Sequence, residues 1–321
     1  MEKDAEGLRE RAMPTNASRV QLWSIGGGKG GIGKSLVTLG LGVSLARLGK
    51  RVILIDGDLG GANLHTLMGV RYPHVRLEHF LTKKVARLED TIIETSVEGI
   101  GLICGADNLL GSANPTYAQK IRLLNEIEAL PAEYVLMDLG AGTSFNTLDF
   151  FNYSGGKITL FTSQAPSLQN AYGFIKSALY RKLYLHFTGD DEVLQRIYRG
   201  GEGGDGGEQG IHSIQDLLNH FEDADPERHA RMTRVLRDFH LFLVINMVKS
   251  TAELKYAEII GSLCRDCLSI QPEIIGHVPF DSGVEPAISQ MMPFPLYQKK
   301  SRAMAGLDQT ALRLVKESKV L

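Results

Sequence analysis

The sequence is poor in cysteine, in long apolar runs and in excess charge of either sign. Its three cysteines (Cys104, Cys264 and Cys267) are too few and too unevenly spaced for a disulfide framework, which fits a reducing compartment. The sequence contains no run of roughly 18 apolar residues, the length needed to span a bilayer. Its polar start, MEKDAEGLRE, lacks the apolar segment of a signal peptide. A formal net charge of −2 gives no general basic field for nucleic acid. We therefore expect a cytoplasmic protein, in which DNA binding would need a local basic patch.

Short apolar runs alternate with helical patterns along the chain. Runs such as RVILID (51–56), YVLMD (134–138) and LFLVIN (241–246) are continuously apolar, which is typical of parallel strands covered on both faces. Further strands are expected at 20–25, 100–104, 158–162 and 273–278. This pattern predicts an α/β fold with a doubly wound, mainly parallel sheet.

Two segments depart from this alternation. Residues 1–18 read as a charged, partly helical arm before a single domain at 19–321. A polar insertion at about 186–236 contains GGEGGDGGEQG (200–210), which has almost no apolar surface to bury and is expected to be flexible. Two short helices are expected in the insertion. The second covers a basic run (228–237), which is interpreted as a solvated face, with contact to DNA or a partner as the alternative.

The most specific motif is GKGGIGKS, which matches the phosphate-binding pattern G-x-x-x-x-G-K-[ST] between a predicted strand and a predicted helix. Its residues are Gly28, Lys29, Gly30, Gly31, Ile32, Gly33, Lys34 and Ser35. Glycines let backbone N–H groups converge on phosphate oxygens, and the positive end of the following helix points at the same anion. We expect Lys34 to reach the β- and γ-phosphates and the Ser35 hydroxyl to ligate Mg²⁺.

Acidic residues follow the second predicted strand, at the edge where an open α/β sheet binds its ligand. Asp56 can reach the water shell of Mg²⁺, and Asp58 can orient or deprotonate an attacking water. The alternative is a pair of turn carboxylates that cap a helix. A third carboxylate, Asp138, ends the strand YVLMD and is followed by LGAG.

The loop contains a lysine, Lys29, that the phosphate-binding pattern itself does not require. With this lysine, the stretch KGGIGKS resembles the deviant Walker A family of P-loop NTPases (the SIMIBI class), which includes MinD, ParA, FlhG and Mrp/ApbC proteins. The resemblance covers about residues 20–320 apart from the insertion. It implies an ATP-dependent homodimer in which Lys29 contacts the phosphates of the other subunit's ATP. It also implies that Asp58, in D-x-D-x-G-x-x-N, is the hydrolytic carboxylate of switch I. Asp138 then begins a Walker B and switch II segment, D-x-x-A-G, and holds Mg²⁺ through water.

The base of the nucleotide is expected to lie near two further residues. Asn246 ends a predicted strand, and its amide could pair with the donor and acceptor edges of adenine. The alternative is an ordinary loop asparagine. The segment HVPFD (277–281) resembles the adenine-side loop of the family, which implies that Pro279 lies against the base. The resemblance implies ATP, and the sequence contains no guanine-selective N-K-x-D motif.

Several stretches, among them VILIDGDLGGANLHTLMGV and DLGAGTSFNTLDFF, resemble FlhG-like and other MinD-like proteins. That branch implies a slow ATPase that acts as a dimerisation switch in the placement of flagella or division, with an SRP-type GTPase or another polar factor as partner. The stretch KDAEGLR (3–9) fits the GTPase-stimulating motif of FlhG at Ala5, Leu8 and Arg9, whereas Asp4 stands in place of its glutamine.

Other outputs of the same family remain open at this point. A ParA-type ATPase would partition DNA, and an Mrp/ApbC-type protein would carry an iron–sulfur cluster on a C-x-x-C pair like Cys264 and Cys267. The apolar stripe around these cysteines instead predicts that they pack in the core. A C-terminal helix that is apolar at 307, 311, 314 and 315 could bind membrane peripherally, but it lacks large aromatic anchors and a dense basic face. We expect this helix to pack on the domain.

Overall fold

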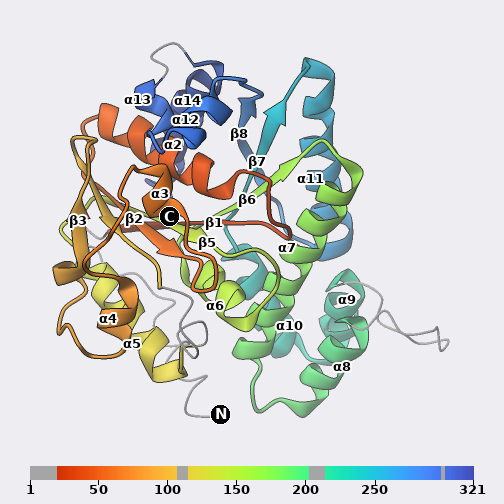
Figure 1. Cartoon of the computed structure of the whole chain (residues 1–321). Coiled ribbons are helices and arrows are strands. Elements are labelled where there is room, and N and C mark those ends of the chain that lie inside the picture. The colour runs from red at the N-terminus through yellow and green to blue at the C-terminus, as the bar shows by residue number, and fades with distance from the viewer. Residues whose placement is uncertain (1–19, 107–114, 202–213, 298–300) are drawn as a thin grey trace.

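The computed structural model describes residues 20–106, 115–201, 214–297 and 301–321. The predicted N-terminal arm with its KDAEGLR stretch, and nearly all of the glycine-rich run at 200–210, lie outside the described residues. The remainder forms an eight-stranded sheet with helices on both faces (Figure 1). In spatial order its strands are β3 (Ile92–Glu94), β4 (Ile100–Ile103), β2 (Val52–Gly57), β5 (Tyr134–Leu139), β1 (Gln21–Gly26), β6 (Gly156–Thr162), β7 (Leu241–Val248) and β8 (Glu273–Pro279).

The sheet is parallel except at one edge, where β3 pairs with β4 in the antiparallel sense. Strand β1 lies between β5 and β6 in the sheet. Strands β2 to β5 lie on one side of β1 and strands β6 to β8 on the other, so the direction in which strands are added reverses at β1. The crevice beyond the carboxyl ends of strands at such a reversal is where open α/β sheets bind ligands. The continuous apolar runs predicted the parallel strands, but the three-residue strand β3 was not predicted.

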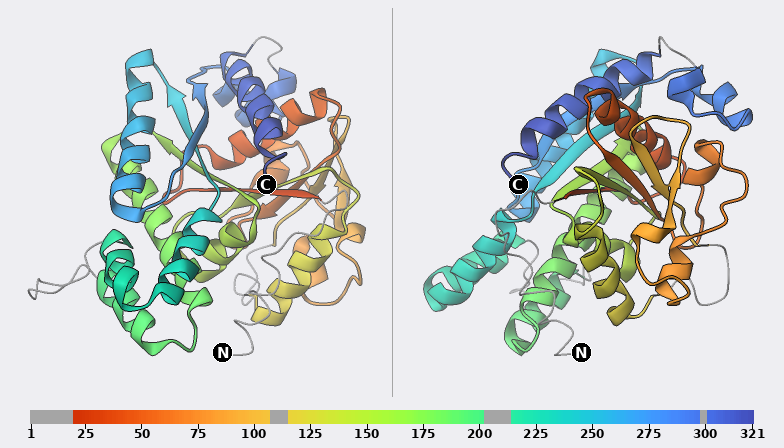
Figure 2. Two further views of the ribbon diagram at one scale, coloured as in Figure 1. Left: turned by 180° about the vertical axis from the view of Figure 1, so that it is seen from behind. Right: turned by 90° about the vertical axis from the view of Figure 1, so that its left-hand side faces the viewer.

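Helices cover the sheet in two layers, as the views from behind and from the side show (Figure 2). One face packs against α2 (Lys34–Arg47), α3 (Leu64–Leu67), α12 (Val284–Ser289), α13 (Phe294–Tyr297) and α14 (Arg302–Glu317). The other face packs against α4 (Leu77–Leu81), α5 (Tyr117–Glu128), α6 (Phe145–Tyr153), α7 (Ala165–His186) and α11 (Lys255–Leu268). Beyond the sheet, α8 (Asp191–Gly201), α9 (Ile214–Ala224) and α10 (Pro226–Arg237) pack on α7, on α11 and on one another. Two 3₁₀ turns, η2 (Glu89–Thr91) and η3 (Thr251–Leu254), complete the described elements.

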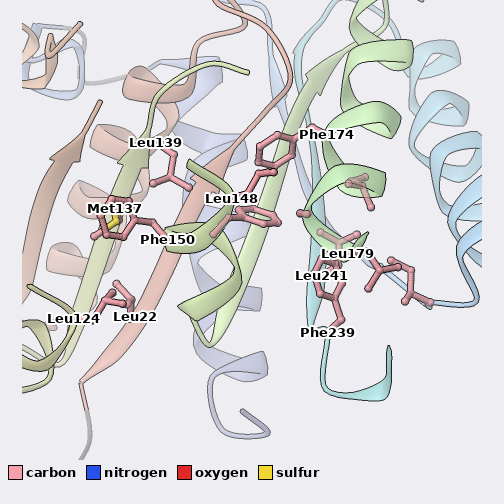
Figure 3. Packing of buried hydrophobic residues seen from close by; sticks show 14 of the residues in the cluster. Leu22, Leu124, Met137, Leu139, Leu148, Phe150, Phe174, Leu179, Phe239 and Leu241 are labelled. Atoms are coloured by element: carbon pink, nitrogen blue, oxygen red, sulfur yellow. The ribbon is translucent and has the colours of Figure 1, made fainter. Parts of the chain in front are cut away.

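The predicted insertion carries the three helices α8, α9 and α10 in its described part. They contribute buried residues such as Val193, Phe221 and Leu236 to the same hydrophobic cluster as the strands. Figure 3 shows part of this cluster, which runs from side chains of β1 and β5 at one end, past those of α6 and α7, to Phe239 and Leu241 at the other. The polar composition of the insertion therefore conceals an apolar face that joins the main core.

Two predictions from helical stripes have different outcomes. The C-terminal helix α14 buries Leu307, Ala311 and Leu314 against the sheet, as expected. The stripe on α11 is wider than the face that the fold covers, because Cys264 is buried whereas Ile259 and Leu263 are 45% and 39% exposed. The prediction that both cysteines pack in the core is thus confirmed for Cys264, whereas Cys267 is only partly buried. Across the described segments, no helix combines the length and the apolar character needed to cross a membrane.

Candidate nucleotide-binding site

The glycine-rich loop joins the end of β1 to the start of α2 at the carboxyl edge of the sheet. Gly33 is the N-cap of α2 with a φ of 87°, a left-handed conformation that favours glycine, and no side chain caps the helix there. The first N–H groups of α2 therefore keep no side-chain acceptor and can serve an anion. A second glycine is required by packing, because a Cβ on Gly28 would lie 2.1 Å from the carbonyl oxygen of Asn170.

The two lysines of the loop occupy different environments. Lys34 is half-buried at the start of α2, and its Nζ lies 3.5 Å from the carbonyl oxygen of Lys29. Burial lowers the pKa of Lys34, while the carboxylates of Asp138 and Asp58 oppose this shift. Lys29, in contrast, is exposed. The structure therefore places Lys34 inside the site and Lys29 on its surface.

Two buried carboxylates lie side by side below the loop. Asp56 and Asp138 are register partners on β2 and β5 and are almost fully buried. Burial and the charge of Asp138 raise the pKa of Asp56 to about 7. Burial also raises the pKa of Asp138 to about 6, although Ser35 and Lys34 act in the opposite direction. Paired carboxylates that resist ionisation together are suited to a divalent cation, which stabilises both charged forms. The donors present at this position, including the Ser35 hydroxyl, fit Mg²⁺.

Asp58 links the two segments that the sequence predicted to be switches. Its backbone N–H donates to Asp56 at 3.2 Å, and its carboxylate accepts from the N–H of Gly60 at 3.2 Å. The same carboxylate approaches Gly140 so closely that a Cβ there would lie 3.1 Å from it. The loops after β2 and β5 therefore meet at Asp58. The role of Asp58 in acting on an attacking water stays a prediction.

Asn246 has a structural contact that sequence reasoning did not predict. Its Nδ2 donates to the carbonyl oxygen of Ile32 at 2.8 Å, and its Oδ1 accepts from the N–H of Met247 at 2.9 Å. The amide therefore braces the phosphate loop from β7. Each end of an amide has capacity for a second hydrogen bond, so the assignment to adenine stays a prediction. Pro279, at the end of β8 beside Val248, also stays a prediction as the residue against the base.

Other residues join the site without having been predicted. The Thr38 hydroxyl lies 3.4 Å from a carboxylate oxygen of Asp138 and donates to the carbonyl of Lys34 at 3.0 Å. Its position four residues after Lys34 on the same helix face is a signal that could have identified it. Asn170, near the start of α7, reaches Gly28 through its main chain, and no side-chain pattern predicts such a contact.

The fold and the site together define a P-loop nucleotide-binding protein. Residues 23–294 match the family model described as the CobQ/CobB/MinD/ParA nucleotide binding domain, and the chain belongs to this family. The flagellum site-determining protein YlxH of Helicobacter pylori is 31% identical over 163 residues, which cover 50% of this chain and 54% of the relative. The antiactivator FleN of Pseudomonas aeruginosa is 28% identical over 159 residues, 49% of this chain and 56% of the relative. The chain thus spans about half the length of the curated relatives it matches.

Among solved structures, the septum site-determining protein MinD of Pyrococcus horikoshii, complexed with Mg-ADP, has a TM-score of 0.63 at 17% identity. The match covers 94% of this chain and 98% of that one. This similarity confirms the predicted doubly wound, mainly parallel P-loop fold. The family match confirms the resemblance to MinD and ParA proteins.

The two cysteines of α11 differ in burial, and Cys267 is partly exposed. Cys264 is fully buried, and burial raises the pKa of its thiol to about 12. Within the described ranges, no group of three or more His, Cys, Asp or Glu side chains is arranged to hold a metal ion. A thiol that resists ionisation is a poor metal ligand, so the site around α11 does not favour the iron–sulfur alternative.

Proposed function

We propose that the protein is an ATP-dependent dimerisation switch that hydrolyses ATP slowly. One observation carries the proposal: a lysine and two buried carboxylates converge below a glycine loop whose helix has no side-chain cap. That combination suits a phosphate chain with a divalent cation, and it leaves Asp58 beside both loops that would sense the γ-phosphate.

In this proposal different residues of the site bind the phosphates, Mg²⁺, the attacking water and the base. The backbone of residues 28–33 and the Nζ of Lys34 hold the phosphates, and Ser35, Asp56 and Asp138 hold Mg²⁺ directly or through water. Bound Mg²⁺ would neutralise charge on the phosphate oxygens. Asp58 positions or deprotonates the attacking water, while Asn246 and Pro279 border the base. The bracing contact from Asn246 to Ile32 supports a role for this asparagine in holding the loop in shape.

Lys29 is proposed to complete the site of a second copy. Its exposure supports this role, because an exposed side chain is available to another subunit. A lysine supplied in this way would stabilise charge on the neighbouring phosphates, as arginine fingers do. Dimerisation would then depend on ATP, and hydrolysis would release the two copies.

The output of the switch is proposed to be spatial regulation of flagella or cell division. The names of the relatives from Helicobacter pylori and Pseudomonas aeruginosa, a flagellum site-determining protein and an antiactivator, support this reading. The switch would act in the cytoplasm on a protein partner, such as an SRP-type GTPase or another polar factor. Peripheral membrane association would require a surface other than the buried face of α14.

Size analysis of an Asp58→Ala protein tests the proposal. With ATP and Mg²⁺ we expect a trapped dimer, and with ADP a monomer, because the variant binds ATP but does not position water. Adding Lys29→Ala to the same protein should abolish the ATP-trapped dimer. Asp266→Ala, which changes an exposed aspartate on α11, is the matched control and should behave as the unaltered protein. A monomer in both nucleotides, or a dimer that is indifferent to Lys29, would contradict the proposal.

A further inference from the structure

An aromatic side chain is exposed to water at the end of β8. Phe280 directly follows this strand, at the carboxyl edge of the sheet, and is 49% exposed. Its backbone N–H donates to the carbonyl oxygen of Val248 on β7 at 2.9 Å. The residue before it is packed tightly, because a Cβ on Gly306 of α14 would lie 2.7 Å from the Cδ of Pro279. The exposed ring is therefore carried by a fixed backbone.

This ring lies on the side of the phosphate loop that is opposite the proposed Mg²⁺ ligands. Asp56 and Asp138 belong to β2 and β5, whereas β6, β7 and β8 follow on the other side of β1. The loop already reaches β7, because the carbonyl oxygen of Ile32 accepts from Asn246 at 2.8 Å. Neighbouring strands are about 5 Å apart, so the end of β8 is the next position along this edge (Figure 1). A nucleotide with its phosphates in the loop and Mg²⁺ at the carboxylates would extend its base toward Phe280.

The side chain of Asn246 has little left to offer a base. It is 6% exposed, its Nδ2 donates to the carbonyl of Ile32, and its Oδ1 accepts from the N–H of Met247. A base beside it gains at most the one hydrogen bond that remains at each end of the amide. The exposed ring of Phe280 offers a different interaction, because bases stack on aromatic side chains through their π-faces.

A lysine flanks the same ring. The Nζ of Lys249 lies 5.4 Å from the centre of the Phe280 ring, within the range of a cation–π interaction. The backbone of Lys249 is itself held, because its N–H donates to the carboxylate of Glu253 at 3.1 Å. One side of the ring is thus covered by the lysine, and its exposed remainder is available to a base.

We propose that the base of the nucleotide stacks on Phe280 and that Lys249 positions the ring for this contact. The inference rests on the proposed nucleotide site and adds to it the residue that supplies most of the binding energy of the base. Phe280 then distinguishes a nucleotide from an inorganic phosphate chain, since the latter can occupy the loop but has no base.

ADP and pyrophosphate, each with Mg²⁺, separate the contribution of the nucleoside from that of the phosphates. Both are titrated calorimetrically into the full-length protein, and the use of ADP avoids the ATP-dependent dimer. We expect Phe280→Ala to weaken ADP binding about tenfold and pyrophosphate binding less than about twofold. Phe280→Trp, which keeps an aromatic face, should retain ADP binding. Equal losses for both ligands in the Phe280→Ala protein, or no loss for ADP, would overturn the proposal.

The control for this experiment is Leu312→Ala, which removes another exposed apolar side chain. Leu312 is 57% exposed on α14, so the variant should change neither affinity. Thermal unfolding midpoints check that both alanine variants fold. A loss of ADP affinity in the Leu312→Ala protein as large as that in the Phe280→Ala protein would show that the effect is not specific to the ring.

The positioning role of Lys249 has its own test. Lys249→Ala should weaken ADP binding about threefold without changing pyrophosphate binding, because an exposed cation–π contact is weak. Lys249→Arg should restore ADP binding, since a guanidinium group also lies over aromatic rings. If Lys249→Ala weakens pyrophosphate binding as much as ADP binding, the lysine acts through its charge on the phosphates and its positioning role is wrong. Failure of the nucleotide site itself would be recognised separately, as an unaltered protein that binds neither ADP nor pyrophosphate.

Discussion

Gly28 and Gly30 belong to the same loop but differ in what surrounds them. A Cβ on Gly28 would collide with the Asn170 carbonyl, whereas a Cβ on Gly30 would meet nothing within 4 Å. We expect Gly28→Ala to lower the free energy of unfolding by about 1–3 kcal/mol, since backbone must move. Gly30→Ala should leave it nearly unchanged but weaken ATP binding, because its methyl group enters the space for phosphate. Urea unfolding and nucleotide titration of both variants check this, and equal stability losses would contradict it.

The buried carboxylates predict an unusual dependence of stability on pH. Asp56 and Asp138 have pKa values of about 7 and 6 in the folded protein, above the ordinary value of 3.8 expected in the unfolded chain. Their contribution to stability is therefore fully present below about pH 4 and is lost as pH rises through 6 to 7. Without nucleotide and Mg²⁺, we expect these residues to cost about 1–4 kcal/mol between pH 5 and 8.

Comparison with an Asp56→Asn protein isolates this effect in urea unfolding at a series of pH values. The unaltered protein should lose stability relative to the variant as pH rises, because asparagine cannot ionise. Parallel profiles for the two proteins would contradict this, because they would show that folding does not change the pKa of Asp56. Mg²⁺ together with ADP should reduce the difference, since a bound cation stabilises the charged carboxylates.

At the scale of elements, a buried ion network ties three helices around the second switch segment. Asp149 on α6 accepts from Lys120 of α5 at 2.6 Å and from Arg181 of α7 at 2.8 and 3.2 Å. Removing Asp149 leaves two cations that are 12% and 19% exposed without their partner. We expect Asp149→Ala to lower the free energy of unfolding by about 3 kcal/mol.

The exposed pair of Arg87 and Glu89 provides the control for this network. Glu89→Ala should change stability by less than about 1 kcal/mol, because water solvates both charges when they separate. Chemical unfolding of the two variants measures the contrast. Similar losses would mean that burial of Asp149 adds nothing to the value of its ion pairs.

Much of the fold followed from local patterns, and the misses have identifiable physical causes. Continuous apolar runs predicted the parallel strands, because burial on both faces leaves a signal in each strand itself. The short strand β3 has little such signal, since its pairing with β4 lies at an edge. In the site, the spacing of GKGGIGKS predicted Lys34 and Ser35, whereas the contact between Asn246 and Ile32 joins residues more than 200 positions apart. No local pattern encodes a contact of that kind.

At the scale of the whole molecule, one apolar cluster runs from the strands into the insertion. We propose that the insertion and the sheet unfold together. The single tryptophan, Trp23, is fully buried in β1 and reports on the sheet by fluorescence, while far-ultraviolet circular dichroism reports on all helices. Phe221→Ala, in α9, should lower both thermal midpoints equally, by the equivalent of about 3–4 kcal/mol. A separate early loss of helix, with the fluorescence transition unmoved, would show that the insertion is an independent unit.

Helix α7 connects the two ends of the molecule (Figure 1). Near its start the main chain of Asn170 lies against Gly28, and near its end Lys182 holds the carbonyl of Asp238 before β7. The two residues are twelve positions apart on one helix, which corresponds to a rise of about 18 Å. If nucleotide exchange shifts the phosphate loop, a straight α7 held by both contacts would tilt and displace the helices at its far end. The fluorescence of a dye attached to α10 would then change on nucleotide exchange, although α10 lies far from the phosphate loop.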